Sequence, residues 1–317
     1  MSEPVRILVV RLGAMGDIVN TLPAAASLKH GIAHSRISWI VEPRWAPLLE
    51  ENPYIDEIIP FDRRSFQSLR GAWQQLRAEA FDIAVDFQGL IKSAIVASAA
   101  RATRIVGFDC EVARECAATW FYSSKGGSKA THVVDQYLDL AAAAGASSLL
   151  RTFPIPAGHP EGVLPDEPFV LASPLAGWGA KQWPVESYAE LGRMLREEYG
   201  LPLVVNAPKP IEAPYTRAHV SGLPGLIDAT RRAVAVVGVD SGPLHLAAAL
   251  GKPGVAIYGP TDPARNGPYD SSMTVLRSTS AVTSYARTHH DTSMREISPS
   301  DVLKALQQQL AAVSVLR

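Results

Sequence analysis

The residues best suited to chemistry in this sequence follow an apolar run that ends near position 240. Asp240, Ser241 and Gly242 come directly after residues 234–239, which have the length of a buried parallel strand, and His245 lies one helical turn further on. A helix that begins at the carboxyl end of a parallel strand directs N–H groups and the positive end of its dipole at an anion. The pattern therefore predicts a phosphate-binding turn, although strand–turn–helix units that bind no ligand share it.

A second glycine-bearing loop follows the first predicted strand. The loop reads RLGAMGD from Arg11 to Asp17, and a helix is predicted over residues 18–28. Its G-x-x-G spacing departs from the G-x-G-x-x-G fingerprint of dinucleotide sites, and Glu42 stands only loosely where the ribose-binding acid would be. Two interpretations of Asp17 remain open: a general base at the carboxyl end of a strand, or the N-cap of the following helix.

Alternating strand and helix patterns run through the whole chain. We expect strands at 7–10, 37–41, 55–60, 83–87, 104–107, 169–172, 201–205, 234–239 and 255–258, with helices at 18–28, 66–80, 90–100, 132–145, 184–199, 226–233, 244–250 and 299–313. Such alternation indicates an α/β fold with parallel sheets covered on both faces. Because residues 153–168 are rich in proline, we place a domain boundary there, with domains over 1–155 and 156–317. Residues 206–225 show little pattern and leave little room for a full crossover.

The composition excludes several classes of protein. A net charge of −1 over 317 residues argues against a general nucleic-acid binder. No apolar run is long enough to span a membrane, and the start of the chain lacks a signal-peptide layout, so we expect a cytoplasmic protein. Cys110 and Cys116 match no zinc pattern and are interpreted as ordinary small side chains in a reducing compartment.

Five motifs taken together resemble one protein family. They are RLGAMGDIVNTLPA, DFQGLIKSA, ARE, GAKQWP and VGVDSGPLHLAAALGKPGVAIYGPTDP, and they span nearly the whole chain in the expected order. The sequence is similar to the bacterial heptosyltransferases that build the inner core of lipopolysaccharide. The resemblance implies two Rossmann-like domains facing across a cleft (the B type of glycosyltransferase, GT-B), and an inverting enzyme without metal or other cofactor. It further implies an ADP-heptose donor, a lipid-linked Kdo/heptose acceptor held by the N-terminal domain, and a final helix that packs back across the cleft.

The resemblance also assigns roles to individual residues. Asp17 matches the general base, Lys181 the lysine on the donor phosphates, and Glu212 a glutamate on the ribose. The other matches are the donor-site turn Asp240, Ser241, Gly242 and His245, and the acceptor-facing basic positions Arg63, Arg64, Lys92 and Arg114. Ala176 and Gly177 stand where some members carry hydroxyl residues, so those contacts to phosphate are absent here.

The residue types suit this reaction on chemical grounds. A carboxylate can take the proton of an acceptor hydroxyl, while a lysine and a helix N-terminus can neutralise a leaving diphosphate without a metal. Lys181 could equally be a solvated loop lysine, and His245 an ordinary helix histidine. The rival functions are a glycosyltransferase for another sugar or acceptor, a non-catalytic two-lobed sugar-binding protein, and an NAD dehydrogenase. Stabilisation by ADP, by free sugar alone or by NADH would separate these classes.

Two groups of mixed basic and aromatic residues suit an anionic lipid surface. They are Arg63, Arg64, Phe66, Arg70 and Trp73, and Trp120, Phe121, Tyr122, Lys125 and Lys129. The sequence therefore also predicts peripheral contact with the inner membrane at its cytoplasmic face, although an ordinary helix face and loop would look the same.

Overall fold

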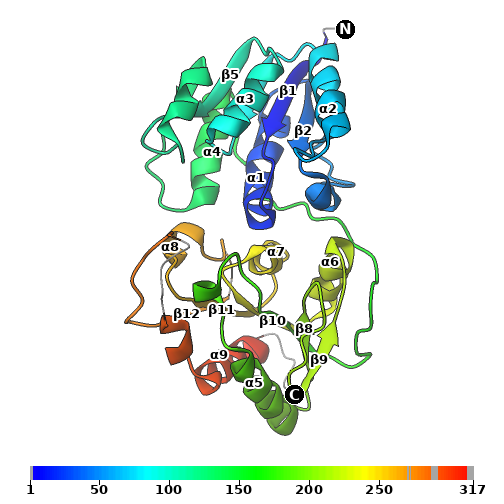
Figure 1. Ribbon diagram of the computed structural model, residues 1–317, viewed down its shortest axis with the longest axis vertical. Coiled ribbons are helices and arrows are strands. Elements are labelled where there is room, and N and C mark those ends of the chain that lie inside the picture. Colours follow the sequence, from blue (N-terminus) through cyan, green and yellow to red (C-terminus); the bar gives the residue numbers. More distant parts are fainter. Residues whose placement is uncertain (1–2, 270, 272, 287–291, 313–317) are drawn as a thin grey trace. The chain divides into compact units, whose positions relative to one another are not determined.

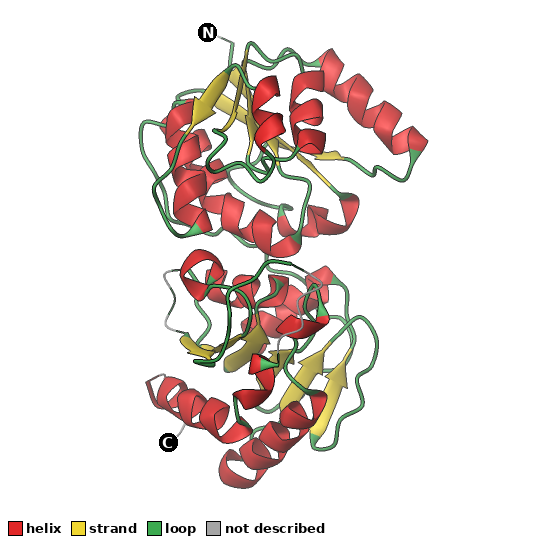
Figure 2. Ribbon diagram, turned by 60° about the vertical axis from the view of Figure 1, so that its left-hand side comes forward, coloured by secondary structure: helices red, strands yellow, loops and turns green. Residues whose placement is uncertain are grey.

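The chain folds into two compact α/β units. The computed structural model describes residues 3–269, 271, 273–286 and 292–312, and the units are Met1–Pro156 and Ala157–Arg317. Each unit holds a six-stranded sheet, parallel throughout, with helices on both faces (Figures 1 and 2). The strand order is β3-β2-β1-β4-β5-β6 in the first unit and β12-β11-β10-β7-β8-β9 in the second. Both follow the order of a Rossmann fold, which confirms the predicted fold class.

The first unit is built on a central strand that is buried on both faces. Its strands are β1 (Val5–Val10), β2 (Ser35–Val41), β3 (Glu57–Pro60), β4 (Ile83–Asp86), β5 (Arg104–Phe108) and β6 (Ser124–Gly126). Its helices are α1 (Met15–Gly31), α2 (Phe66–Ala78), α3 (Ile91–Ala99) and α4 (Val133–Ala144), with 3₁₀ turns η1 (Pro43–Leu48) and η2 (Cys116–Phe121). Helices α1 and α4 pack side by side on one face of the sheet, while α2 and α3 cover the other, where Leu8 and Val10 meet Leu76 and Ala97 (Figure 1).

The second unit repeats this plan. Its strands are β7 (Val170–Ser173), β8 (Leu203–Asn206), β9 (Thr216–His219), β10 (Ala235–Val239), β11 (Gly254–Tyr258) and β12 (Thr274–Arg277). Its helices are α5 (Val185–Tyr199), α6 (Leu223–Arg232), α7 (Gly242–Ala249), α8 (Pro263–Asn266) and α9 (Pro299–Ala312), with 3₁₀ turns η3 (Gly179–Lys181) and η4 (Ser293–Glu296). Helix α9 packs against α5 and buries Val302, Leu306 and Leu310 in the core of this unit. The end predicted for this helix, Val313, lies outside the described residues.

Three edge strands escaped the sequence analysis. Strand β9 lies within the weakly patterned residues 206–225 and pairs in parallel with β8, and the connection over 207–215 contains no helix. Strands β6 and β12 have three and four residues respectively. Most residues of these three strands are exposed or half-buried, so no continuous apolar run marks them and hydrogen-bonded pairing identifies them instead.

The expectation of two unpaired cysteines is wrong, because Cys110 and Cys116 form a disulfide. A tight turn brings their Cα atoms to 4.5 Å. Asp109 organises the turn: its Oδ1 accepts hydrogen bonds from the backbone N–H groups of Glu111 and Val112. Because disulfides are rare in reducing compartments, the cysteines no longer support the expectation of such a compartment. Among the described residues no helix combines the length and the apolar character that a membrane span needs.

Candidate active site

Ligands of open α/β sheets bind at the point where the strand order reverses, and each unit has such a point. In the first unit this point lies between β1 and β4, whose following loops leave the sheet in opposite directions. The Arg11 guanidinium donates to the carbonyl of Phe87 at 2.6 Å, and the backbone N–H of Leu12 donates to Oε1 of Gln88 at 3.1 Å. These bonds join the RLGAMGD loop to the DFQG loop.

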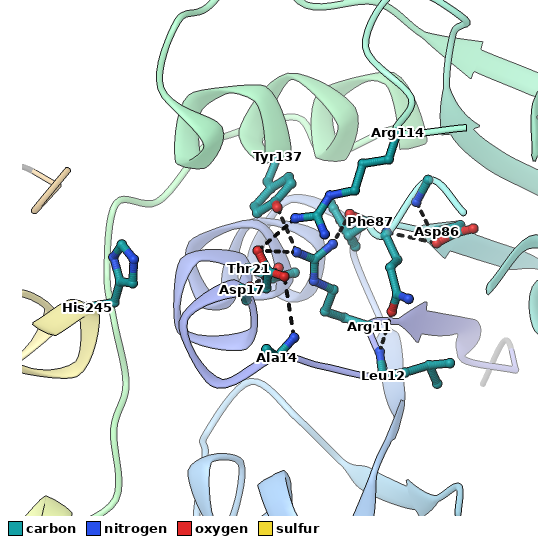
Figure 3. Close-up of polar contacts among 12 residues, drawn as sticks. Arg11, Leu12, Ala14, Asp17, Thr21, Asp86, Phe87, Arg114, Tyr137 and His245 are labelled. Carbon is teal, nitrogen blue, oxygen red and sulfur yellow. Dashed lines mark hydrogen bonds and ion pairs between the residues drawn. The ribbon is translucent and has the colours of Figure 1, made fainter. Parts of the chain in front are cut away.

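Asp17 lies at the centre of this first cluster (Figure 3). Helix α1 begins earlier than predicted, so Asp17 is the third residue of the helix and Ala14 is the N-cap. The interpretation of Asp17 as N-cap is therefore wrong: its Oδ2 instead accepts a long hydrogen bond, 3.4 Å, from the backbone N–H of Ala14. Its Oδ1 is 2.7 Å from the Arg11 guanidinium and 3.0 Å from that of Arg114.

The two arginines reach Asp17 from different surroundings. Arg11 is completely buried and also donates to the Tyr137 hydroxyl at 2.9 Å, with its guanidinium carbon 5.2 Å from the Tyr137 ring centre. Tyr137 itself packs edge-on against Phe87. The charge of Asp17 raises the pKa of Arg114, which keeps that guanidinium protonated. The sequence analysis missed Arg11 and Tyr137; the available signal was an arginine placed directly between an apolar strand and the glycine loop.

A buried carboxylate fixes the neighbouring loop. Asp86 accepts hydrogen bonds from the hydroxyls of Ser93 and Tyr122, each at 2.8 Å, and from the backbone N–H groups of Gln88 and Gly89. Burial raises the pKa of Asp86, although these four donors favour its charged form. Tyr122 is thus buried, so its assignment to a lipid-facing group is wrong.

The predicted acceptor-facing residues all follow strands at one edge of the first sheet. Arg63 and Arg64 lie in the turn after β3 and are exposed; they line a cavity of about 280 Å³ together with Glu42, Arg44 and Asp62. Lys92 is exposed in the first turn of α3, which follows β4. Among these four predicted residues, Arg114 forms an ion pair with Asp17 within the described part of the chain.

In the second unit, the order reverses between β10 and β7, and a buried ion pair lies at this point. The Lys181 ammonium is 2.6 Å from Oδ2 of Asp240, and both side chains are largely buried. The His245 ring lies 3.6 Å from Oδ1 of the same carboxylate. Burial alone would raise the pKa of Asp240, but the nearby His245 ring and the charge of Lys181 outweigh burial and hold that pKa well below its usual range. Lys181 also lies over the ring of Trp178, 4.5 Å from its centre.

Unpaired hydroxyl groups lie at the ends of the strands next to this ion pair. Ser241 is the N-cap of α7, but its side chain makes no capping hydrogen bond. Its hydroxyl and those of Ser173 and Thr261 are buried, and none has a hydrogen-bond partner among the described residues. The three residues follow or end the adjacent strands β10, β7 and β11. Buried hydroxyls are rarely left unpaired, so their grouping beside the first turn of α7 indicates a polar ligand.

The remaining predicted donor residues take different positions. Gly242 is the first residue of α7 and presents backbone to this edge of the sheet. Glu212 is exposed in the connection between β8 and β9. Within the described ranges, no three histidine, cysteine or carboxylate side chains gather as a metal site.

Comparison with known proteins identifies the family. The family model described as "Glycosyltransferase family 9 (heptosyltransferase)" matches residues 69–296. The chain belongs to glycosyltransferase family 9. It is 29% identical to lipopolysaccharide heptosyltransferase 1 of Escherichia coli K12, covering 86% of this chain and 93% of the relative. It is also 29% identical to the enzyme of that name from Pseudomonas aeruginosa PAO1, covering 86% and 84%.

Solved structures share the fold of this family 9 glycosyltransferase. The E. coli heptosyltransferase WaaC with ADP superposes with a TM-score of 0.78 at 24% identity, over 96% of this chain and 99% of that one. The E. coli ADP-heptose lps heptosyltransferase II gives the same TM-score at 23% identity, over 98% and 99%. The GT-B assignment made from the sequence is confirmed, as is the assignment to a family of glycosyltransferases.

Proposed function

We propose that this family 9 glycosyltransferase moves a heptose from ADP-heptose to the lipid-linked Kdo/heptose inner core of lipopolysaccharide, with inversion at the anomeric carbon. The names of the relatives from E. coli and P. aeruginosa support this choice of reaction. One solved structure of the E. coli enzyme is described with ADP-2-deoxy-2-fluoro heptose, which supports the choice of donor. The observation that carries the proposal is the buried Lys181–Asp240–His245 group, with its unpaired hydroxyls beside the start of α7.

The donor diphosphate binds in the second unit, within the domain over 156–317. Its charge is met by Lys181 and by the backbone N–H groups at the start of α7, and its oxygens accept hydrogen bonds from Ser241 and neighbouring hydroxyls. Gly242 lets the phosphates approach the backbone, and Glu212 binds the ribose. Neutralising the leaving diphosphate in this way lowers the barrier to departure without a metal ion.

The acceptor binds in the first unit, within the domain over 1–155, where Arg63, Arg64, Lys92 and Arg114 match its negative charge. Asp17 takes the proton from the acceptor hydroxyl. The oxygen uses the released electron pair to bond to the anomeric carbon, and the bond from that carbon to the diphosphate breaks, leaving its electron pair on the phosphate oxygen. General-base help of this kind contributes roughly 10²- to 10⁴-fold to the rate.

The test is transfer itself. The protein is incubated with ADP-heptose and defined inner-core fragments, and the products are read by mass spectrometry. A mass increase of one heptose, absent when ADP-glucose replaces the donor, is the expected result. Asp17→Asn should lose roughly 10²-fold or more in kcat, whereas Asp166→Asn, on an exposed loop of the second unit, serves as the matched control. Transfer from another nucleotide sugar in preference to ADP-heptose would refute the donor assignment.

We also propose that the first unit docks on the cytoplasmic face of the inner membrane. Helix α3 lies between α2 and η2, and these three elements expose Phe66 (81%), Trp73, Ile95 and Trp120 (83%). Basic residues flank these side chains: Arg63, Arg64, Arg70, Arg77, Lys92 and Lys125. Aromatic side chains enter the interface of a bilayer while lysine and arginine attract anionic headgroups.

Vesicle sedimentation tests the docking surface. Binding should increase with the fraction of anionic lipid, fall with salt, and weaken in the double variant Phe66→Ser/Trp120→Ser. Val163→Ser in the second unit removes an equally exposed apolar side chain, at 83%, and controls for general hydrophobicity. Equal binding of both variants, or binding to neutral vesicles that ignores salt, would refute this surface.

A further inference from the structure

Two guanidinium groups contact the same oxygen of Asp17. Arg11 lies 2.7 Å and Arg114 3.0 Å from Oδ1, while Oδ2 receives the 3.4 Å hydrogen bond of Ala14 (Figure 3). Two adjacent positive charges favour the ionised carboxylate and oppose its protonation. The arrangement therefore suits a stable anion better than a group that must accept a proton.

The two arginines differ in how firmly they are held. Arg11 has no exposed surface, and the Phe87 carbonyl and the Tyr137 hydroxyl fix its guanidinium. Arg114 has 44% of its side chain exposed and comes from the loop closed by the Cys110–Cys116 disulfide. The bond from the Glu115 backbone N–H to the Gly89 carbonyl anchors the backbone of this loop. The backbone of the loop is thus fixed, whereas the Arg114 side chain is partly exposed and interacts with Asp17 and Tyr137.

We propose that Arg114 is a removable counter-ion of Asp17: an oxyanion of the acceptor draws its guanidinium away, and only then can the Asp17 carboxylate accept a proton. Arg11 stays in place and continues to hold Oδ1. This inference rests on the proposed function, in which Asp17 is the base. Its consequence is specificity: an acceptor without the anion leaves the base masked, so charge recognition is coupled to turnover as well as to binding.

Binding measurements test the coupling without catalysis. Asp17 and the acceptor oxyanion compete for Arg114, so Asp17→Asn should bind an acidic inner-core fragment more tightly, by about fivefold to tenfold. The gain should vanish in the double variant Arg114→Gln/Asp17→Asn relative to Arg114→Gln alone. Calorimetry that finds no tighter binding by Asp17→Asn would overturn the proposal whether or not the donor is ADP-heptose.

Turnover gives a second and more distinctive signature. For the wild type, converting the acceptor carboxylate to its amide should lower kcat by about tenfold or more, besides raising KM. Arg114→Gln should instead show kcat values for the acid and the amide within about twofold, and should process the amide faster than the wild type does. An acceptor lacking its phosphate but keeping its carboxylate shows which oxyanion draws Arg114 away.

The controls separate this inference from the proposed function. Arg193→Gln, on the exposed side of α5, removes an arginine far along the chain from Asp17 and should leave the kcat ratio of acid to amide unchanged. Asp17→Asn active on both acceptors would refute the base itself. An Arg114→Gln protein that is folded, yet slower than wild type on the amide, would overturn the masking role while leaving Asp17 as the base.

Discussion

The pairing of Lys181 with Asp240 makes a sharp prediction for the variant Asp240→Asn. The two groups lie 2.6 Å apart, with 11% and 7% of their side chains exposed, so the amide leaves an ammonium that is nearly buried and lacks its counter-ion. Breaking a buried pair costs roughly 3–5 kcal/mol. Because Lys181 keeps its contact with the Trp178 ring, we expect the lower end, about 3 kcal/mol.

The assay is thermal unfolding of wild type and variant with and without ADP. A loss of this size corresponds to a fall of roughly 6–12 °C in the melting temperature of a unit the size of the second one. If the diphosphate binds Lys181, ADP supplies the missing negative charge, so it should stabilise Asp240→Asn more than it stabilises the wild type. The double variant Lys181→Met/Asp240→Asn should recover stability without ADP but lose the response to ADP.

The pH dependence follows from the depressed pKa of Asp240 in the folded state. A carboxyl group of this kind contributes its stability above the pKa of the unfolded chain, about 3.9, and loses it as pH falls through the lower folded value. The difference in free energy of unfolding between wild type and Asp240→Asn should therefore be constant from about pH 5 to pH 8.

The ADP assay gives the result that would refute this reasoning. If ADP stabilises Asp240→Asn less than it stabilises the wild type, the carboxylate itself binds the donor.

Three further variants probe the first unit. Cys110→Ser should lower the free energy of unfolding of this unit by roughly 2 kcal/mol, because the disulfide to Cys116 closes a short loop. Denaturant titration under oxidising and reducing conditions tests this. Identical unfolding curves of the wild type under both conditions would contradict the prediction. Tyr122→Phe should cost about 1–3 kcal/mol by removing a donor from the buried Asp86 carboxylate, and a neutral effect in the same titration would show that water replaces the hydroxyl. Arg11→Met should lower kcat with little change in ADP affinity, and calorimetry showing weakened ADP binding would assign Arg11 another role.

The sequence predicted most elements of the fold because both sheets are buried on two faces. Continuous apolar runs such as Ile7–Val10 and Val236–Val239 can be recognised without an alignment. Turns that carry glycine, aspartate or serine directly after such runs located both candidate sites. The short strand over Thr216–His219 was missed because two of its residues are exposed, so apolar pattern does not reveal it.

Contacts between distant residues were beyond the reach of sequence patterns. Arg114 meets Asp17 across 97 positions, and Tyr137 meets Arg11 across 126. The strand order brings such residues together, because the carboxyl ends of β1 and β5 lie at one edge of the sheet although the two strands are far apart in the chain. The motif around Asp17 indicated a carboxylate suited to general-base chemistry, but Arg114, which pairs with Asp17, and Tyr137, which holds Arg11, come from other segments.

The same electrostatic arrangement occurs at both strand-order reversals. In the first unit a carboxylate, Asp17, is neutralised by two arginines; in the second, Asp240 is neutralised by Lys181 with His245 nearby. In each case the cation that we propose for a substrate anion is already paired inside the protein. A substrate must then compete with a carboxylate for that cation, and this competition lowers the affinity for the substrate. While no substrate is bound, the carboxylate neutralises the cation. In the proposed function, each substrate displaces a carboxylate when it binds. The two units then share one property: a charged side chain changes its partner when the anion of the substrate is present. An unpaired lysine or arginine at these positions would bind phosphate more tightly and discriminate less, since any small anion could then occupy the site.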